Sequence, residues 1–314
     1  MRYLVTGGAG FIGSNIVEKL LQLGHEVRVL DNFSTGQYEN IASFEKDIDL
    51  IDGDIRDFAT VTKAARAVDF VLHQAALPSV PRSVADPLTS NAVNVDGTLN
   101  ILEASKRAGV KRFVFASSSS VYGESEELPK HEQMVPSPLS PYAVNKLTNE
   151  YYCKVYWQLY KLPTVSLRYF NVFGPRQDPK SEYAAVVPRF ITALQNGQPP
   201  VVYGDGGQSR DFTYVENAVN ANLLAAQTDA MSGGVFNCAC GAQYTLNQLL
   251  ERLRAIMGID IQAMYDKPRP GDIRHSFAAI DRLKKHGFEV AVDFDQGLRR
   301  TVAFFAGQPA SRAR

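Results

Sequence analysis

The sequence predicts an α/β fold in which a doubly wound parallel sheet is joined to a second, smaller α/β lobe. Short apolar runs alternate with amphipathic helical patterns along the first half of the chain. This alternation is typical of parallel strands connected by right-handed helical crossovers. The 314 residues exceed the usual length of one domain, and a hydrophobic content of 45% is enough for a substantial core. We therefore expect two lobes.

The alternating pattern covers residues 1–170. The apolar runs predict strands at 3–6, 26–30, 48–51, 70–73, 113–117 and 164–169, and the segments between them predict helices at 11–23, 57–66, 91–108 and 141–160. Their spacing fits one nucleotide-binding domain.

The pattern changes after about residue 170. Loops rich in Pro and Gly, such as 198–200 and 204–207, separate shorter helices, which predicts a smaller substrate lobe over 171–314. A long helical pattern at 215–227 could return to the main sheet, so we expect 211–235 to rejoin the first domain. The last residues, 307–314, are small, polar and basic, and we expect them to fray.

Composition and charge exclude several classes of function. Thirty-three basic residues balance thirty-three acidic ones, so no global field would draw the protein to nucleic acid or to an anionic membrane. The first residues lack the apolar stretch of a signal peptide, and no segment has eighteen uninterrupted apolar residues, so we expect a cytoplasmic protein. Neither the three cysteines nor the five histidines have the spacing of a metal site, and we expect no metal.

A glycine-rich turn follows the first predicted strand and precedes the first predicted helix. Gly7 permits the tight turn, Gly10 lets the backbone approach a pyrophosphate, and Gly13 allows the helix to pack closely on the strand. Asp31 ends the second predicted strand, at about the distance expected for an acid that binds a ribose. Strand, turn, helix and acid together predict a dinucleotide site.

The acidic residues also indicate which dinucleotide binds. A carboxylate at Asp31 accepts hydrogen bonds from the adenosine ribose diol and repels an additional 2′-phosphate, which favours NAD over NADP. Asp54 ends the third predicted strand and could bind the adenine amino group, although Asp is also common in the turns after strands.

Tyr142 and Lys146 are four residues apart and lie on one helical face if the helix begins at Pro141. A free phenol has a pKa near ~10, so bringing it to neutrality requires about 4 kcal/mol of preferential phenolate stabilisation. The ammonium of Lys146 and the positive nicotinamide ring of NAD are the opposite charges available for this. Hydroxyls follow the strand at 113–117, at the edge of the sheet where ligands bind, and one of them can bond the reacting group of the substrate.

Several motifs together give the chain a specific resemblance. The segments TGGAGFIG (6–13), DN (31–32), GDI (53–55), HQAA (73–76), SSSSVYG (117–123), PYAVNK (141–146) and RYFNVFG (168–174) resemble the extended short-chain dehydrogenases, in particular the UDP-hexose 4-epimerases. The resemblance covers nearly the whole chain and implies a Rossmann domain. It implies that Tyr142 is the catalytic base, that Lys146 binds the nicotinamide ribose and tunes Tyr142, and that Ser118 bonds the sugar at C4, a role that Ser119 could share.

The same resemblance implies two sets of binding residues. The set around NAD is Gly7, Gly10, Phe11, Ile12, Gly13, Asp31, Asn32, Ser34, Thr35, Gly36, Asp54, Ile55, Gln74, Ala75, Ala76, Asn94, Ser117, Tyr142, Lys146 and Tyr169. The set around the UDP-sugar is Pro78, Ser79, Ser118, Ser119, Asn171, Ala185, Val186, Val187, Val202, Tyr203, Arg210, Arg269, Asp272 and Ser276. Within it, Arg210 and Arg269 match the positions that clamp the diphosphate, and Asp272 matches the position that binds the uridine ribose.

An epimerase of this kind removes the proton and hydride at C4, turns the 4-keto sugar over and returns the hydride to its other face. A nucleotide-sugar 4,6-dehydratase is an alternative, but that group carries an Asp-Glu pair where this chain has only serines. A UDP-glucuronate 4-epimerase or decarboxylase remains open because it shares the motifs of the nucleotide domain. An NAD-binding regulatory protein is the alternative outside enzymes, and the presence of Tyr142, Lys146 and Ser118 argues against it.

Three departures from the family pattern point to a substrate. Ser276 stands where epimerases restricted to plain hexoses have a tyrosine, Ala185 where they have an asparagine, and Pro78 where they have a lysine. Each departure removes bulk or a competing polar contact near C2 of the sugar. We therefore expect UDP-N-acetylglucosamine and UDP-N-acetylgalactosamine to be interconverted, with UDP-glucose and UDP-galactose accepted as well. The resemblance also implies a homodimer that pairs the helices at 91–108 and 141–160 in a four-helix interface.

Overall fold

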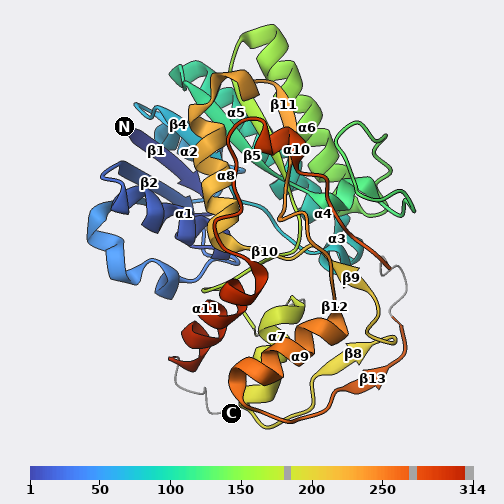
Figure 1. Cartoon of the computed structure of the whole chain (residues 1–314). Helices are drawn as coiled ribbons and strands as arrows, with labels where there is room; N and C mark the ends of the chain where they lie inside the picture. Colours follow the sequence, from blue (N-terminus) through green and yellow to red (C-terminus); the bar gives the residue numbers. More distant parts are fainter. Residues whose placement is uncertain (180–184, 269–273, 308–314) are drawn as a thin grey trace.

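A seven-stranded parallel sheet forms the centre of the molecule (Figure 1). The computed structural model describes residues 1–179, 185–268 and 274–307. The strand order is β11-β6-β5-β4-β1-β2-β3. The strands are β1 (Arg2–Thr6), β2 (Glu26–Asp31), β3 (Ile48–Asp52), β4 (Phe70–His73), β5 (Arg112–Ser118), β6 (Thr164–Tyr169) and β11 (Gly234–Cys238).

The doubly wound Rossmann-like fold predicted from the sequence is confirmed. All six predicted strands are present, and each boundary lies within one residue of the prediction. Strand β11, which was not predicted from the sequence, pairs in parallel with β6 at one edge of the sheet. The strand order reverses between β1 and β4, which both pair in parallel with their neighbours. In doubly wound sheets such a reversal opens a crevice at the carboxyl ends of the strands, where ligands bind.

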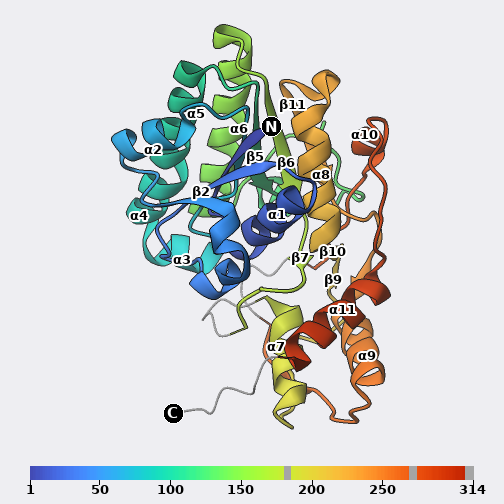
Figure 2. The same cartoon turned by 90° about the vertical axis from the view of Figure 1, so that its left-hand side faces the viewer.

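Helices cover both faces of the sheet (Figure 2). Successive side chains of a strand point to opposite layers of helices. In β1, Leu4 belongs to one buried apolar cluster, and Tyr3 and Val5 belong to the other. Because both faces are buried, the strands read as nearly continuous apolar runs. One layer holds α2 (Phe58–Ala65), α5 (Gly97–Ala108) and α6 (Pro141–Tyr160), and the other holds α1 (Phe11–Gln22) and α8 (Val215–Gln227).

The predicted helices are confirmed, with one difference. The helix expected at 91–108 starts earlier and is interrupted, since α4 (Pro87–Asn91) passes through a π-helical turn (Ala92–Asp96) before α5 begins. A π-turn inserts an extra residue into the helical ladder and is frequent at functional sites. Helix α6 starts where the sequence indicated, because Ser140 caps it by accepting a hydrogen bond from Ala143 N and Pro141 opens its first turn.

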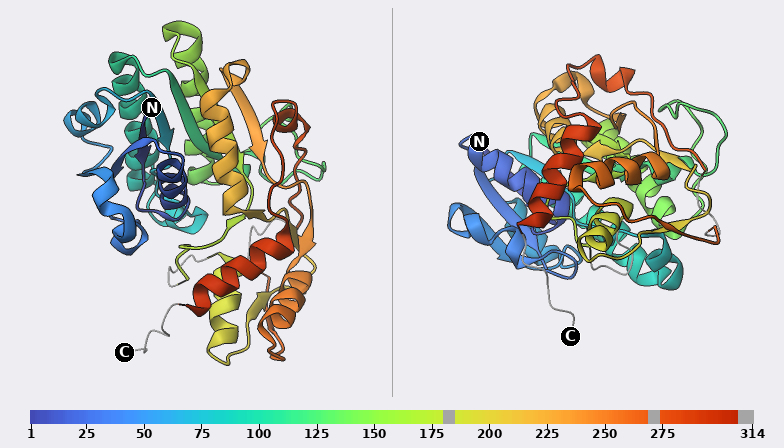
Figure 3. Two further views of the ribbon diagram at one scale, coloured as in Figure 1. Left: turned by 60° about the vertical axis from the view of Figure 1, so that its left-hand side comes forward. Right: turned by 60° about the horizontal axis from the view of Figure 1, so that its bottom comes forward.

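A second group of elements lies below the carboxyl edge of the sheet (Figure 3). Its three longer helices contact one another, and three small sheets pair β8 with β13, β9 with β12, and β7 with β10. Short helices α3 and α10 complete the fold. The bounds are α3 (Val80–Ala85), β7 (Val172–Phe173), α7 (Val186–Gln195), β8 (Val201–Tyr203), β9 (Ser209–Arg210), β10 (Thr213–Tyr214), β12 (Tyr244–Thr245), α9 (Leu246–Met257), β13 (Met264–Asp266), α10 (Asp281–Lys284) and α11 (Phe294–Ala306).

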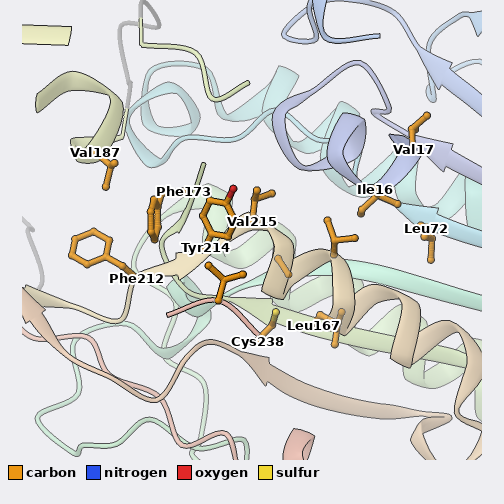
Figure 4. Close-up of a cluster of buried hydrophobic side chains, with 14 of the residues drawn as sticks. Ile16, Val17, Leu72, Leu167, Phe173, Val187, Phe212, Tyr214, Val215 and Cys238 are labelled. Carbon is orange, nitrogen blue, oxygen red and sulfur yellow. The ribbon is translucent and has the colours of Figure 1, made fainter. Parts of the chain in front are cut away.

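Apolar side chains connect this lower group to the main sheet without interruption (Figure 4). The rings of Phe173, Phe212 and Phe294 pack against one another, with centroid distances of 5.7 Å between Phe173 and Phe294 and 5.2 Å between Phe212 and Phe294. Val187 of α7 and Leu167 of β6 belong to the same buried cluster. Within the described residues, no helix is long and apolar enough to cross a membrane.

Candidate active site

A cavity of about 690 Å³ lies at the carboxyl edge of the sheet, where the strand order reverses. Most residues expected around NAD line it, and three expected around the substrate line it as well. Those expected for NAD are Gly7, Gly10, Phe11, Ile12, Gly13, Asp31, Asn32, Ser34, Thr35, Gly36, Asp54, Ile55, Gln74, Ala75, Ala76, Ser117, Tyr142, Lys146 and Tyr169, and those expected for the substrate are Pro78, Ser79 and Ala185.

The glycine turn leaves no room for side chains. A Cβ atom on Gly13 would lie 2.1 Å from the carbonyl oxygen of Gly7, so α1 can approach β1 only with glycine at this position. Gly7 itself has a φ of +69°, and a Cβ there would lie 2.7 Å from Ala75 N. Gly10, the residue at the N-cap of α1, has no side chain that could cap the first turn. The free backbone N–H groups and the helix dipole therefore suit a pyrophosphate, which is the fit expected for a dinucleotide.

Two carboxylates lie at the far end of this cavity. Asp31 is 8% exposed, and its two oxygens accept hydrogen bonds from Ala9 N and Phe33 N, both at 2.9 Å. Burial raises the pKa of Asp31, which the backbone hydrogen bonds oppose. Asp54 forms an ion pair with Arg56 at 2.7 Å, and this partner holds its pKa at about 2. Both side chains line the cavity, so ribose and adenine could bind beside them.

The three residues expected to be catalytic lie together at the other end. Lys146 Nζ donates a hydrogen bond of 2.7 Å to Ala116 O and lies 5.7 Å from the centroid of the Tyr142 ring. Burial raises the pKa of Tyr142 to about 12, and a hydrogen bond with Ser118 opposes this shift. Burial also lowers the pKa of Lys146 to about 8. Ser118 ends β5, and Ser119 begins the short 3-10 turn that follows it.

A buried ion pair between Glu150 and Arg168 lies next to these three residues. Glu150 follows Lys146 by one turn of α6, and Arg168 of β6 donates two hydrogen bonds to its carboxylate, at 2.9 and 2.7 Å. The two side chains are 5% and 4% exposed. Ser117 Oγ donates a third hydrogen bond to Glu150, at 2.5 Å. Glu150 thus connects α6 to β6 through Arg168 and to β5 through Ser117, the residue before Ser118.

Five of the described residues expected at the site line neither cavity, which are Asn94, Ser118, Ser119, Val202 and Ser276. Asn94, in the π-turn, accepts a hydrogen bond from Leu77 N and donates one to Leu77 O, at 2.8 and 3.2 Å. It therefore shapes the segment that carries Ala76 and Pro78. Val202 is fully buried in β8 and packs into the core, while its neighbours on the strand face the second cavity.

A second cavity of about 270 Å³ adjoins the first, and Ala185 lines both. Six of the residues expected to bind the substrate line it, which are Asn171, Ala185, Val186, Val187, Tyr203 and Arg210. Arg189 and Gln208 also line it, and sequence reasoning missed both. The guanidinium of Arg189 lies 5.7 Å from the centroid of the Tyr203 ring. Two arginines, Arg189 and Arg210, therefore line one cavity, and guanidinium groups suit an anionic ligand.

The remaining substrate predictions lie at the segment around residue 276. Arg269 and Asp272 lie outside the described residues. Ser276 is partly exposed, and its N–H donates a hydrogen bond to Ser209 O at 3.0 Å, which places it beside the strand that carries Arg210. Among the described residues that line the two cavities, Ser276 is not included.

Sequence reasoning also missed a hydrogen-bonded ring at the wall of the first cavity. Tyr169 Oη donates to Gln74 Oε1, Gln74 Nε2 donates to Asn222 Oδ1, and Asn222 Nδ2 donates to Tyr169 Oη, at 3.1, 3.1 and 2.6 Å. Asn222 lies on α8, so nothing local in the sequence indicated its partners. Arg176 and Gln177 line the cavity too, and their position directly after the RYFNVFG segment was a signal that could have found them.

Comparison with known proteins identifies the family. The model of the NAD dependent epimerase/dehydratase family matches residues 3–239. A UDP-N-acetylglucosamine 4-epimerase from Methanobrevibacter ruminantium, solved in complex with UDP-N-acetylmuramic acid, is 45% identical with a TM-score of 0.93, covering 97% of this chain and 98% of that chain. The Thermus thermophilus UDP-glucose 4-epimerase in complex with NAD is 42% identical with a TM-score of 0.90, covering 98% and 99%.

A protein related in sequence supports the same family. The UDP-glucose 4-epimerase of Mycolicibacterium smegmatis is 38% identical over 314 residues, which cover 97% of this chain and 98% of that protein. Because the family model spans most of the chain and these relatives align over nearly all of it, the chain belongs to the NAD-dependent epimerase/dehydratase family and is an NAD-dependent epimerase.

Proposed function

We propose that this enzyme is a UDP-sugar 4-epimerase. The observation that carries the proposal is the junction of the two cavities at Ala185. One cavity has the dinucleotide features and holds Tyr142 and Lys146, and the other holds Arg189 and Arg210. A nucleotide sugar with its diphosphate in the second cavity could place its sugar ring against Tyr142 in the first. The named activities of the relatives support the same reaction class.

In the proposed reaction Tyr142 accepts the proton of the sugar 4-hydroxyl, and Ser118 bonds that hydroxyl and orients it. NAD, when bound, supplies the hydride acceptor and donor for C4. After the 4-keto sugar turns over and presents the other face of C4 for the return of the hydride, Tyr142 returns its proton to the C4 oxygen. The guanidinium groups of Arg189 and Arg210 hold the diphosphate during this rotation, because bidentate contacts to phosphate oxygens fix its position. Arg269 and Asp272 remain proposed ligands of the diphosphate and the uridine ribose.

Proton transfer depends on the charge of Lys146. With its pKa raised to about 12, Tyr142 holds its proton at neutral pH unless a positive charge stabilises the phenolate. Lys146 supplies that charge below its own pKa of about 8. Its hydrogen bond to Ala116 O keeps the ammonium at the same end of α6 as the phenol.

We propose that N-acetylated UDP-hexoses are main substrates and that UDP-glucose and UDP-galactose are also accepted. Two of the three positions behind this proposal, Pro78 and Ala185, line the cavity that holds Tyr142. Both side chains are small or compact, and neither carries a charge. Ser276 lies beside the strand of Arg210, where a larger side chain could reach the second cavity.

The proposed function is tested by incubating the purified holoenzyme separately with UDP-N-acetylglucosamine, UDP-glucose and UDP-glucuronate, without added nucleotide. We expect the C4 epimers of the first two sugars to form while the absorbance of NADH stays constant. Steady accumulation of NADH in proportion to product would contradict epimerisation, and a product only from UDP-glucuronate would contradict the substrate class.

We also propose a homodimer that pairs α5 and α6 of two copies. Helix α6 carries apolar side chains that remain exposed in the single chain, with exposed fractions of 47% for Val144, 58% for Tyr151 and 69% for Leu159. Burying such a stripe against a second copy would remove apolar surface from water. Sedimentation of the purified protein tests this arrangement.

A further inference from the structure

The segment 174–178 forms part of the wall of the dinucleotide cavity. Arg176, Gln177 and Asp178 line the cavity together with Gly10 and Phe11 at the start of α1. The segment follows β7 and has left the sheet, so the strand ladder no longer supports it. Contacts with other elements must therefore hold it in place.

Two side chains of α1 provide these contacts. Asn15 Nδ2 donates a hydrogen bond to Pro175 O at 3.2 Å, and Glu18 forms an ion pair with Arg176 at 2.7 Å. Asn15 and Glu18 lie on the same face of α1 as Phe11, since they follow it by four and seven residues. The helix that presents its N-terminus to the pyrophosphate thus also anchors the segment beside it.

The ion pair holds Arg176 in an unfavourable environment. Its backbone has a φ of +69°, which costs free energy for a residue other than glycine. Its side chain is 15% exposed and lies 5.7 Å from the centroid of the Phe44 ring. Its buried Nη1 atom has no hydrogen-bond partner among the residues that the structure describes. Glu18 is its counter-charge. Without Glu18, the desolvated guanidinium would favour solvent, and the segment would lose its main anchor.

We propose that Glu18, Arg176 and Asn15 form a latch that retains NAD in the cavity. These are positioning residues, because they act through the wall segment and not on the reacting atoms. An epimerase returns its cofactor to the starting redox state in each turnover, so a wall that slows release suits this chemistry. The proposal rests on the NAD dependence of the family and not on the sugar, so a failure of the proposed substrate would leave it untouched.

The latch is tested by measuring how fast bound NAD exchanges. Purified holoenzyme is mixed with excess isotopically labelled NAD, desalted at set times and analysed for the label retained. Glu18→Gln and Arg176→Gln should each exchange NAD about five- to tenfold faster than the wild type, as expected for losing a partly buried charged hydrogen bond. Turnover of Glu18→Gln, whose residue does not line the cavity, should stay within twofold at saturating NAD. The charge-reversed double variant Glu18→Arg/Arg176→Glu should restore slow exchange.

Asp49→Asn is the matched control, because it breaks the Arg28–Asp49 pair, which has the same 2.7 Å separation and a similarly buried arginine. Exchange in Glu18→Gln within twofold of the wild type would overturn the latch, and so would equal acceleration in the control. Acceleration in Arg176→Gln alone would mean that Arg176 binds the dinucleotide directly, which also overturns it. Asn15→Ala removes a neutral contact of the same segment, and it should accelerate exchange even if the charge variants do not fold.

Discussion

Replacing Glu150 by Gln should strongly destabilise the protein. Glu150 is 5% exposed and accepts hydrogen bonds from Arg168 Nε, Arg168 Nη2 and Ser117 Oγ. Gln keeps the shape of the side chain but removes its charge and turns one acceptor into a donor. The guanidinium of Arg168, itself 4% exposed, then lies buried without a counter-charge.

The expected loss follows from this burial. Removing one partner of a buried ion pair costs about 3–5 kcal/mol, which corresponds to a fall of roughly 5–8 °C in Tm for a chain of this size. Calorimetry or circular dichroism on NAD-loaded protein measures the change. Turnover should fall as well, because Ser117 precedes Ser118 and loses the partner that holds the end of β5.

Two controls separate charge burial from simple loss of a contact. Glu216→Gln breaks the ion pair between Glu216 and Arg300, whose side chains are 42% and 51% exposed, respectively. Because this pair is exposed, the substitution should change Tm by less than about 2 °C. The double variant Glu150→Leu/Arg168→Met replaces both charges by apolar groups and should recover much of the lost stability. If Glu150→Gln melts within about 2 °C of the wild type, or if the double variant melts lower than the single one, the reasoning is wrong.

Three further predictions concern the reaction. Tyr142→Phe should lower kcat by about 10²–10⁴-fold with little change in substrate binding, whereas Ser118→Ala should be milder; near wild-type turnover in Tyr142→Phe would exclude it as the base. Because the pKa of Lys146 is lowered to about 8, the lysine loses its charge as the pH rises through that value, and kcat should fall on the alkaline side. Lys146→Arg should move this fall in kcat to higher pH. A pH profile that Lys146→Arg leaves unchanged would contradict the role assigned to Lys146. Ser276→Tyr should abolish activity on UDP-N-acetylglucosamine while sparing UDP-glucose, because added bulk clashes only with the larger substituent; equal retention of both activities would exclude Ser276 as the gate.

Local sequence signals were sufficient for the nucleotide-binding elements. A strand that runs into the glycine turn and then into a helix is a contiguous pattern, so Gly7, Gly10 and Gly13 could be assigned without knowledge of the rest of the chain. Asp31 could be placed because it ends the neighbouring strand. Tyr142 and Lys146 are one helical turn apart, so their common face follows from helix geometry alone.

Residues whose partners are distant in the sequence could not be found in this way. Asn222 reaches the cavity wall only because α8 packs on the sheet beside Gln74 and Tyr169. Arg189 gives no local signal on α7, and the role proposed for it rests on the cavity that it shares with Arg210. The strand β11 was missed because its short apolar run follows a segment with the features of the second lobe, and only its pairing with β6 identifies it.

The sequence by itself determined the first six strands of the main sheet, the longer helices between them, the dinucleotide turn and the Tyr142–Lys146 pair, because each depends on neighbours within a few residues. The tertiary structure decided which of the predicted side chains meet. It brought Ser118 to Tyr142, turned Asn94 away from the cavity to hold Leu77, and buried Val202 while exposing its neighbours to the second cavity. It also joined Glu18 to Arg176 across 158 residues of chain. These contacts arise from the packing of whole helices and strands. Because the free energy of that packing is distributed over the core, no local sequence pattern predicts them.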